Sequence, residues 1–97
     1  MIEVIIDNKA KAQLDKLYKY ILKDSYQNAE MVRSKIVESI MALSVKWEHH
    51  PPDKYRKIKD LTYRAYEILK YRVTYHLIDN KILVTTIRHT KMNPLHY

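Results

Sequence analysis

The 97-residue sequence contains no glycine, no cysteine and no phenylalanine, and it has only three prolines. The absence of glycine argues against nucleotide-binding sites in which the backbone must approach a phosphate closely, such as Walker loops and dinucleotide fingerprints. Without cysteine, it has no disulfide, no thiolate nucleophile and no cysteine-based zinc site. The lack of disulfides fits a reducing compartment, so we expect a cytoplasmic protein.

Long apolar runs are also missing. No stretch approaches the ~20 apolar residues of a membrane span. The apolar segment at the N-terminus is short and is interrupted by Glu3 and followed by Asp7, unlike a secretory signal. A chain of this length supplies one core, so we expect a single domain over residues 1–97 with no membrane association.

Positive charge is present in excess, but only in the second half of the chain. Residues 1–53 carry eight basic and eight acidic side chains, whereas residues 54–97 carry ten and three, which accounts for the net charge of +7. A neutral half joined to a basic half suggests a scaffold with one face for an anionic partner. A basic face that is simply solvated is the alternative interpretation.

The apolar residues predict an α+β domain. Alternation over residues 2–6 predicts a short strand. A helix capped by Asn8 and ending near 23–24, then a helix capped by Ser25 and continuing to Leu43, form a helical hairpin. The Pro-Pro pair at 51–52 ends the helical pattern and marks a loop.

The second half of the chain returns to an apolar period of two. Residues 61–66, 71–77 and 82–88 predict three strands, in which Leu61, Tyr63 and Ala65 form one apolar set and Asp79–Asn80 forms a hairpin turn. The parity change between Val84 and Ile87 requires a bulge or a two-sided strand. The order is β-α-α-β-β-β, with the helical hairpin packed on one face of a small antiparallel sheet.

Basic and aromatic residues of the strands are the first candidates for chemistry. Lysines and arginines neutralise phosphates and tyrosines stack on exposed bases, so these strands are compatible with single-stranded RNA. The tyrosines are more simply explained as half-buried residues of a sheet. His89 could act as a general acid or base in RNA cleavage, or be an ordinary histidine at a strand end. His49 and His50 have no third ligand at a readable spacing, so we expect no metal and no cofactor.

Several segments together resemble the RelE/ParE superfamily of bacterial toxins. The third strand, Tyr71-Arg72-Val73-Thr74-Tyr75, is similar to a "YRVxY" motif, and the next strand leads into Ile87-Arg88-His89 and a basic tail with Pro94. Residues 12–21 and 25–29 are similar to the helical hairpin of ParE and plasmid-stabilisation toxins. The resemblance covers almost the full chain and implies the toxin of a type II toxin–antitoxin pair.

The resemblance also implies a choice between two branches. RelE-like members cleave mRNA on the ribosome, whereas ParE-like members inhibit DNA gyrase without a nuclease site. Arg72 matches the third-strand arginine of the nucleases, Arg64 fits only after a one-residue shift, and Met92 replaces the tail arginine. Because most of the nuclease set is displaced or missing, we favour a ParE-like growth inhibitor acting on gyrase and neutralised by a cognate antitoxin.

Three alternatives stay open. The first is a RelE-like ribosome-dependent mRNA endoribonuclease, in which Arg64, Arg72 and His89 are catalytic if their side chains converge. The second is a non-enzymatic basic RNA-binding module, and the third is a toxin fold that retains only antitoxin binding. We expect the antitoxin complex to set the oligomeric state. In every case, the candidates for contact with a target or nucleic acid are Lys54, Arg56, Lys57, Lys59, Arg88, Lys91 and Tyr97.

Overall fold

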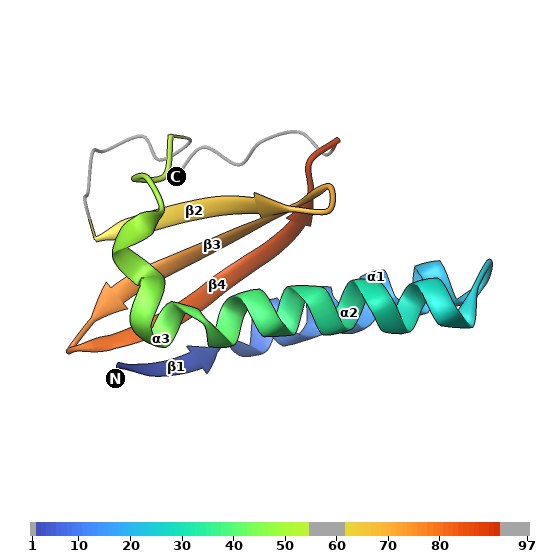
Figure 1. Cartoon of the computed structure of the whole chain (residues 1–97), viewed down its shortest axis with the longest axis horizontal. Coiled ribbons are helices and arrows are strands. Elements are labelled where there is room, and N and C mark those ends of the chain that lie inside the picture. The colour runs from blue at the N-terminus through green and yellow to red at the C-terminus, as the bar shows by residue number, and fades with distance from the viewer. Residues whose placement is uncertain (1, 55–61, 92–97) are drawn as a thin grey trace.

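A computed structural model describes residues 2–54 and 62–91 and shows the predicted α+β architecture (Figure 1). The helices are α1 (Asn8–Leu22), α2 (Tyr26–Met41) and the short α3 (Leu43–Lys46), followed by the 3₁₀ turn η1 (Trp47–His49). The strands are β1 (Glu3–Ile6), β2 (Tyr63–Ile68), β3 (Tyr71–Ile78) and β4 (Lys81–His89). None of the helices among the described residues is long and apolar enough to cross a membrane.

The four strands form one sheet in the order β1-β4-β3-β2. The last three strands are antiparallel, as predicted, and β1 joins them as a parallel partner of β4, with Val4 opposite Ile82. The sequence predicts this first strand but does not indicate which strand it pairs with. The first and last strands of the described chain are therefore neighbours, with β1 at one edge of the sheet and β4 between β1 and β3.

The helical hairpin packs on one face of the sheet, and its tip extends beyond the strands (Figure 1). The apolar spacing predicted for α2 is confirmed, because Ala29, Val32, Ile36 and Ile40 are all buried. Val32, Ile36 and Ile40 belong to one apolar core with strand residues such as Val73 and the fully buried Tyr75. Apolar burial on this face, at about 25 cal/mol per Å² of apolar surface, drives the association of hairpin and sheet.

Helix caps explain where the two long helices start. The Ser25 side chain accepts a hydrogen bond from the Asn28 N–H at 3.0 Å, so the predicted cap of α2 is confirmed. The cap predicted for α1 is wrong by one residue, since Asn8 is the first helical residue. Asp7 occupies the cap position and its side chain makes no capping hydrogen bond.

Two tight turns connect β2 to β3 and β3 to β4 without glycine. The predicted Asp79–Asn80 turn is confirmed, with φ values of 50° and 59°. The other turn places Leu69 and Lys70 at 57° and 101°, a region that costs a residue with a Cβ roughly 1–2 kcal/mol. The predicted bulge also occurs, because Thr74 faces Thr86 while Tyr75 faces Val84, which leaves Thr85 as the extra residue of β4.

Candidate functional site

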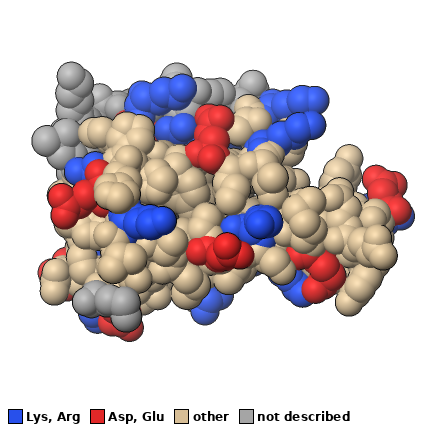
Figure 2. Space-filling view, in the orientation of Figure 1, with Lys and Arg blue, Asp and Glu red and all other residues tan. Residues whose placement is uncertain are grey.

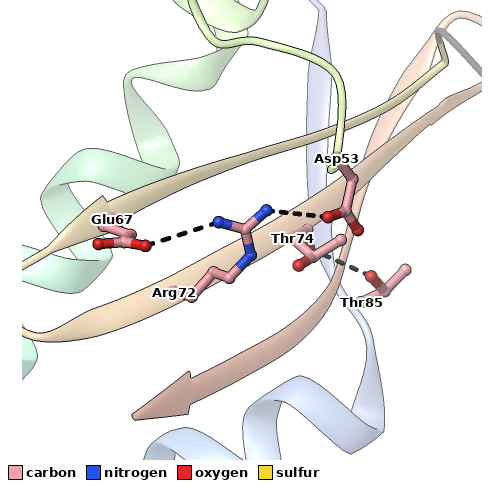
Figure 3. A network of polar contacts seen from close by, with 5 residues as sticks. All are labelled: Asp53, Glu67, Arg72, Thr74 and Thr85. Carbon is pink, nitrogen blue, oxygen red and sulfur yellow. Dashed lines mark hydrogen bonds and ion pairs between the residues drawn. The ribbon is translucent and has the colours of Figure 1, made fainter. Parts of the chain in front are cut away.

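Arg72 lies near the start of β3 on the sheet face opposite the helices, which we call the outer face. Its guanidinium donates to Asp53 Oδ1 at 2.9 Å and lies 3.6 Å from Glu67 Oε2 (Figure 3). The Asp53 side chain is 1% exposed, and that of Arg72 is 17% exposed. The positive charge of the predicted nuclease arginine is therefore balanced by two carboxylates of the same chain.

Backbone pairing brings Asp53 to this position. The Asp53 N–H donates to the Tyr63 carbonyl at 2.9 Å, and the Ala65 N–H donates to the Pro51 carbonyl at 3.2 Å, so residues 51–53 pair with the outer edge of β2. Side chains alternate along a strand, so Tyr63, Ala65 and Glu67 all point to the outer face. The small side chain of Ala65 leaves room for the Arg72 guanidinium to cross β2 and reach Asp53.

A shallow hollow of about 390 Å³ lies at this edge of the sheet. Its lining includes Ala65, the Arg72–Glu67 pair, the two prolines and Lys54. Thr74, next to Arg72 on β3, is 2% exposed, and its carbonyl accepts a hydrogen bond from the Thr85 hydroxyl at 3.2 Å (Figure 3). The bulged residue of β4 is thus tied to β3 beside the ion pair.

Arg64 points to the helix side of the sheet. It lies opposite Tyr75, which belongs to the core. Its Nη1 donates to the His50 carbonyl at 2.6 Å and to the Glu48 carbonyl at 3.4 Å, and its guanidinium lies over the Trp47 ring at 5.4 Å. Arg64 therefore holds the main chain of η1 against β2, which is a structural role.

Aromatic rings surround this contact. The His50 ring stacks on Tyr66 with a centroid separation of 4.3 Å, and the Tyr75 hydroxyl donates to the Trp47 carbonyl at 2.5 Å. Burial, followed by the nearby charges of His49 and Arg64, lowers the pKa of His50. Burial also raises the pKa of Tyr75, so its phenol stays protonated and remains a donor to the Trp47 carbonyl.

His89 ends β4 on the helix side of the sheet. It lies opposite Tyr71, and the two rings meet edge to face at 5.2 Å. Its Nδ1 accepts a hydrogen bond from the Lys91 N–H at 3.0 Å. The ring is thus oriented by the backbone of the following turn.

The three residues predicted to form a nuclease site do not converge. Residues directly opposite in an antiparallel pair point to the same face. Arg64 faces the helices opposite Tyr75, whereas Arg72 faces outward opposite Glu67 and Arg88. His89 is on the helix side at the other end of β2 and β3 from Arg64, because its neighbour Tyr71 pairs with Ile68. The sheet itself separates the two arginines.

The remaining contact candidates are only partly described. Lys54 and Lys91 are exposed, and Arg88 lies beside Arg72 on the outer face. Figure 2 shows basic side chains gathered over the strand half of the molecule, at the top of the view, while basic and acidic side chains alternate along the helices. The candidates outside the described residues are Arg56, Lys57, Lys59 and Tyr97.

Asp53 and Glu67 are the polar residues that sequence reasoning missed. Asp53 follows the Pro-Pro pair, which predicts a loop, and no periodicity in the sequence indicates that residues 51–53 pair with β2. Glu67 stands five residues before Arg72 across a two-residue turn, a spacing that places the two opposite each other once the turn is known. Within the described part of the chain, no group of three or more metal-ligating side chains is present.

A helical hairpin on one face of a four-stranded sheet, with the basic residues on the strand half, is the architecture expected of a RelE/ParE-like toxin. Residues 4–94 match the family described as ParE toxin of type II toxin-antitoxin system, parDE. Among solved structures, a chain of the chromosomal ParDE TA system from P. aeruginosa is similar at a TM-score of 0.73 and 19% identity. The similarity covers 94% of this chain and 98% of that one. A comparison with curated proteins found no match.

The family match extends over nearly the whole sequence, so the chain belongs to the ParE toxin family. The P. aeruginosa structure shares its fold.

Proposed function

We propose that this protein is the toxin of a type II toxin–antitoxin pair, that it arrests bacterial growth by acting on DNA gyrase in the cytoplasm, and that a cognate antitoxin neutralises it. Membership of the ParE family supports the toxin role. The name of the similar P. aeruginosa structure, a ParDE system, supports an antitoxin as partner.

The state of Arg72 favours gyrase inhibition over RNA cleavage. Cleavage by 2′-hydroxyl attack needs a cationic group near the phosphorane charge and a proton donor for the leaving oxygen, both on one side of the substrate. Here Arg72 is paired with Asp53, and Arg64 lies on the other side of the sheet, bonded to main-chain carbonyls. The toxin therefore acts by binding its target, without a chemical step of its own.

Charge supports an antitoxin with an acidic segment. The chain carries a net charge of +7, all of it contributed by residues 54–97. Complementary charge accelerates association and selects the partner. An antitoxin whose toxin-binding region is acidic would meet the strand half of the molecule first.

Two assays test this proposal. Induced expression should stop growth of the host bacterium, and co-expression of the neighbouring antitoxin gene should restore it. The purified protein should then inhibit supercoiling by gyrase and leave mRNA intact in a ribosome-dependent cleavage assay. Unimpaired growth at good expression would contradict the toxin role. Cleavage of mRNA that is lost in His89→Ala would instead establish the RelE-like alternative.

A further inference from the structure

The side of α2 turned away from the core carries a regular pattern that the proposed function does not use. Ala29, Val32, Ile36 and Ile40 are buried, and the last three belong to the core shared with the sheet. Met31, Ser34, Glu38 and Met41 recur at intervals of three and four on the opposite side, and all four are exposed. In Figure 1, α2 crosses the front of the molecule with no other described element before it.

The pattern is apolar at both ends and polar in the middle. Met31 and Met41 are 43% and 47% exposed. Between them are a hydroxyl, a carboxylate and, on the flank, the exposed Lys35. Within the described residues, neither Lys35 nor Glu38 takes part in an ion pair given by the structure.

We propose that this face of α2 binds the same face of a second copy of the chain in an antiparallel, two-fold symmetric dimer. With the axis level with Ile36, Met31 of each copy meets Met41 of the other, and Ser34 meets Glu38. Lys35 lies on the same flank as Glu38 and reaches the carboxylate of the opposite chain. Each group therefore meets a complementary one, as a two-fold interface requires.

The charges favour this register over the register in which the two-fold axis is level with Glu38. Moving the axis to Glu38 would place two carboxylates against each other and two methionines against polar or smaller groups. Like charges in direct contact disfavour that arrangement. The self-complementary positions of Lys35 and Glu38 are the reason for assigning the face to a second copy of the chain.

Helix α1 is compatible with the same axis. The Tyr18 hydroxyl bonds to Glu30, which fixes how the antiparallel α1 and α2 lie beside each other. Counting from that contact, Ala12 of α1 lies level with Ile36. Ala12 is exposed, and its small side chain allows the two α1 helices to approach at the axis. We expect a contact limited to these helix faces to be weak and transient.

Charge reversal tests the register in the full chain. Analytical ultracentrifugation over a concentration series reaching about 1 mM should show a monomer–dimer equilibrium. Lys35→Glu and Glu38→Lys should each weaken dimerisation at least about tenfold, whereas the double reversal should restore it. Lys70→Glu, in the exposed turn between β2 and β3, is the matched control and should leave dimerisation unchanged. A protein that stays monomeric throughout the series would overturn the proposal.

Cysteine cross-linking supplies a second, independent measurement. The native chain has no cysteine, so Met31→Cys/Met41→Cys should form covalent dimers under mild oxidation. The two positions are about 15 Å apart along one helix, too far for a disulfide within a chain. Met31→Cys alone should cross-link poorly, and equal cross-linking by the single variant would refute the register. If the reversals instead weaken only antitoxin binding by a monomer, the face belongs to the antitoxin. Growth arrest is measured separately and does not decide this question.

Discussion

Replacing Arg72 by alanine is expected to lower the free energy of unfolding by about 3 kcal/mol. The change removes the guanidinium from the Asp53 carboxylate, which is 1% exposed and therefore poorly solvated. Asp53→Ala should cost less, about 1–2 kcal/mol, because Arg72 is 17% exposed and keeps Glu67 at 3.6 Å. The larger loss of stability is expected when the more buried charge, that of Asp53, is left without its partner.

Urea unfolding followed by fluorescence can measure both losses. Trp47 is the only tryptophan and lies in η1, close to the segment that the ion pair holds. A loss of about 3 kcal/mol should lower the melting temperature by roughly 12–24 °C in a domain of this size. The double variant should be less destabilised than the sum of the single ones by about 2 kcal/mol.

Lys19→Ala is the control, since its pair with Asp15 at 3.0 Å is exposed on α1 and should contribute less than about 0.5 kcal/mol. Additive losses in the Arg72 and Asp53 variants would refute the reasoning. Losses of the size seen in the control would do the same, because the ion pair would then contribute no more than a surface pair.

Three further predictions concern local contacts. Tyr75→Phe should cost about 1–2 kcal/mol in urea unfolding, because the Trp47 carbonyl loses its donor. Ser25→Ala should cost about 1 kcal/mol by removing the cap of α2, and Ser25→Asp should retain most of the stability in the same assay. The pKa of His50 is lowered in the folded state, so its neutral form favours folding. This contribution is complete above the ordinary pKa of about 6.5 and is lost as the pH falls through the folded value. The urea midpoint should therefore fall less on acidification in His50→Phe than in the native protein, and an equal fall would exclude His50 as the cause.

The elements of the fold are predictable from apolar spacing because one face of each long element is buried. In α2 the spacing identifies Ala29, Val32, Ile36 and Ile40 as buried, but Met41, which the same pattern adds to the apolar stripe, is 47% exposed. The bulge in β4 is also predictable, because a strand cannot place Ile82, Val84 and Ile87 on one face without an extra residue. The parallel partner of β1 is not predictable, since its short alternating pattern fits either edge of the sheet.

The site is less predictable because tyrosine and arginine can lie on either the buried or the exposed face of a strand. We grouped Tyr63 and Ala65 with Leu61 as one apolar set of the second strand, but in β2 it is Tyr66 that faces the helices, bonded to Ser39 at 2.8 Å. Leu61 lies outside the described residues. Arg64 points to the same face as Tyr66, because the two are separated by one residue. Whether Arg64 and Arg72 lie on the same face of the sheet could therefore be judged only from the register of β2 and β3.

The position of β4 has a consequence for the order in which the protein can be made and folded. This strand is central in the sheet, yet it is the last to be synthesised, and the first strand of the chain has no partner other than β4 among the described residues. A nascent chain that lacks residues 81–89 can form the helical hairpin and the β2–β3 pair but cannot complete the core. Pairing the two ends of the sequence also requires closing a loop of nearly the full chain length, which slows folding. The complete four-stranded sheet therefore cannot form until residues 81–89 have been translated.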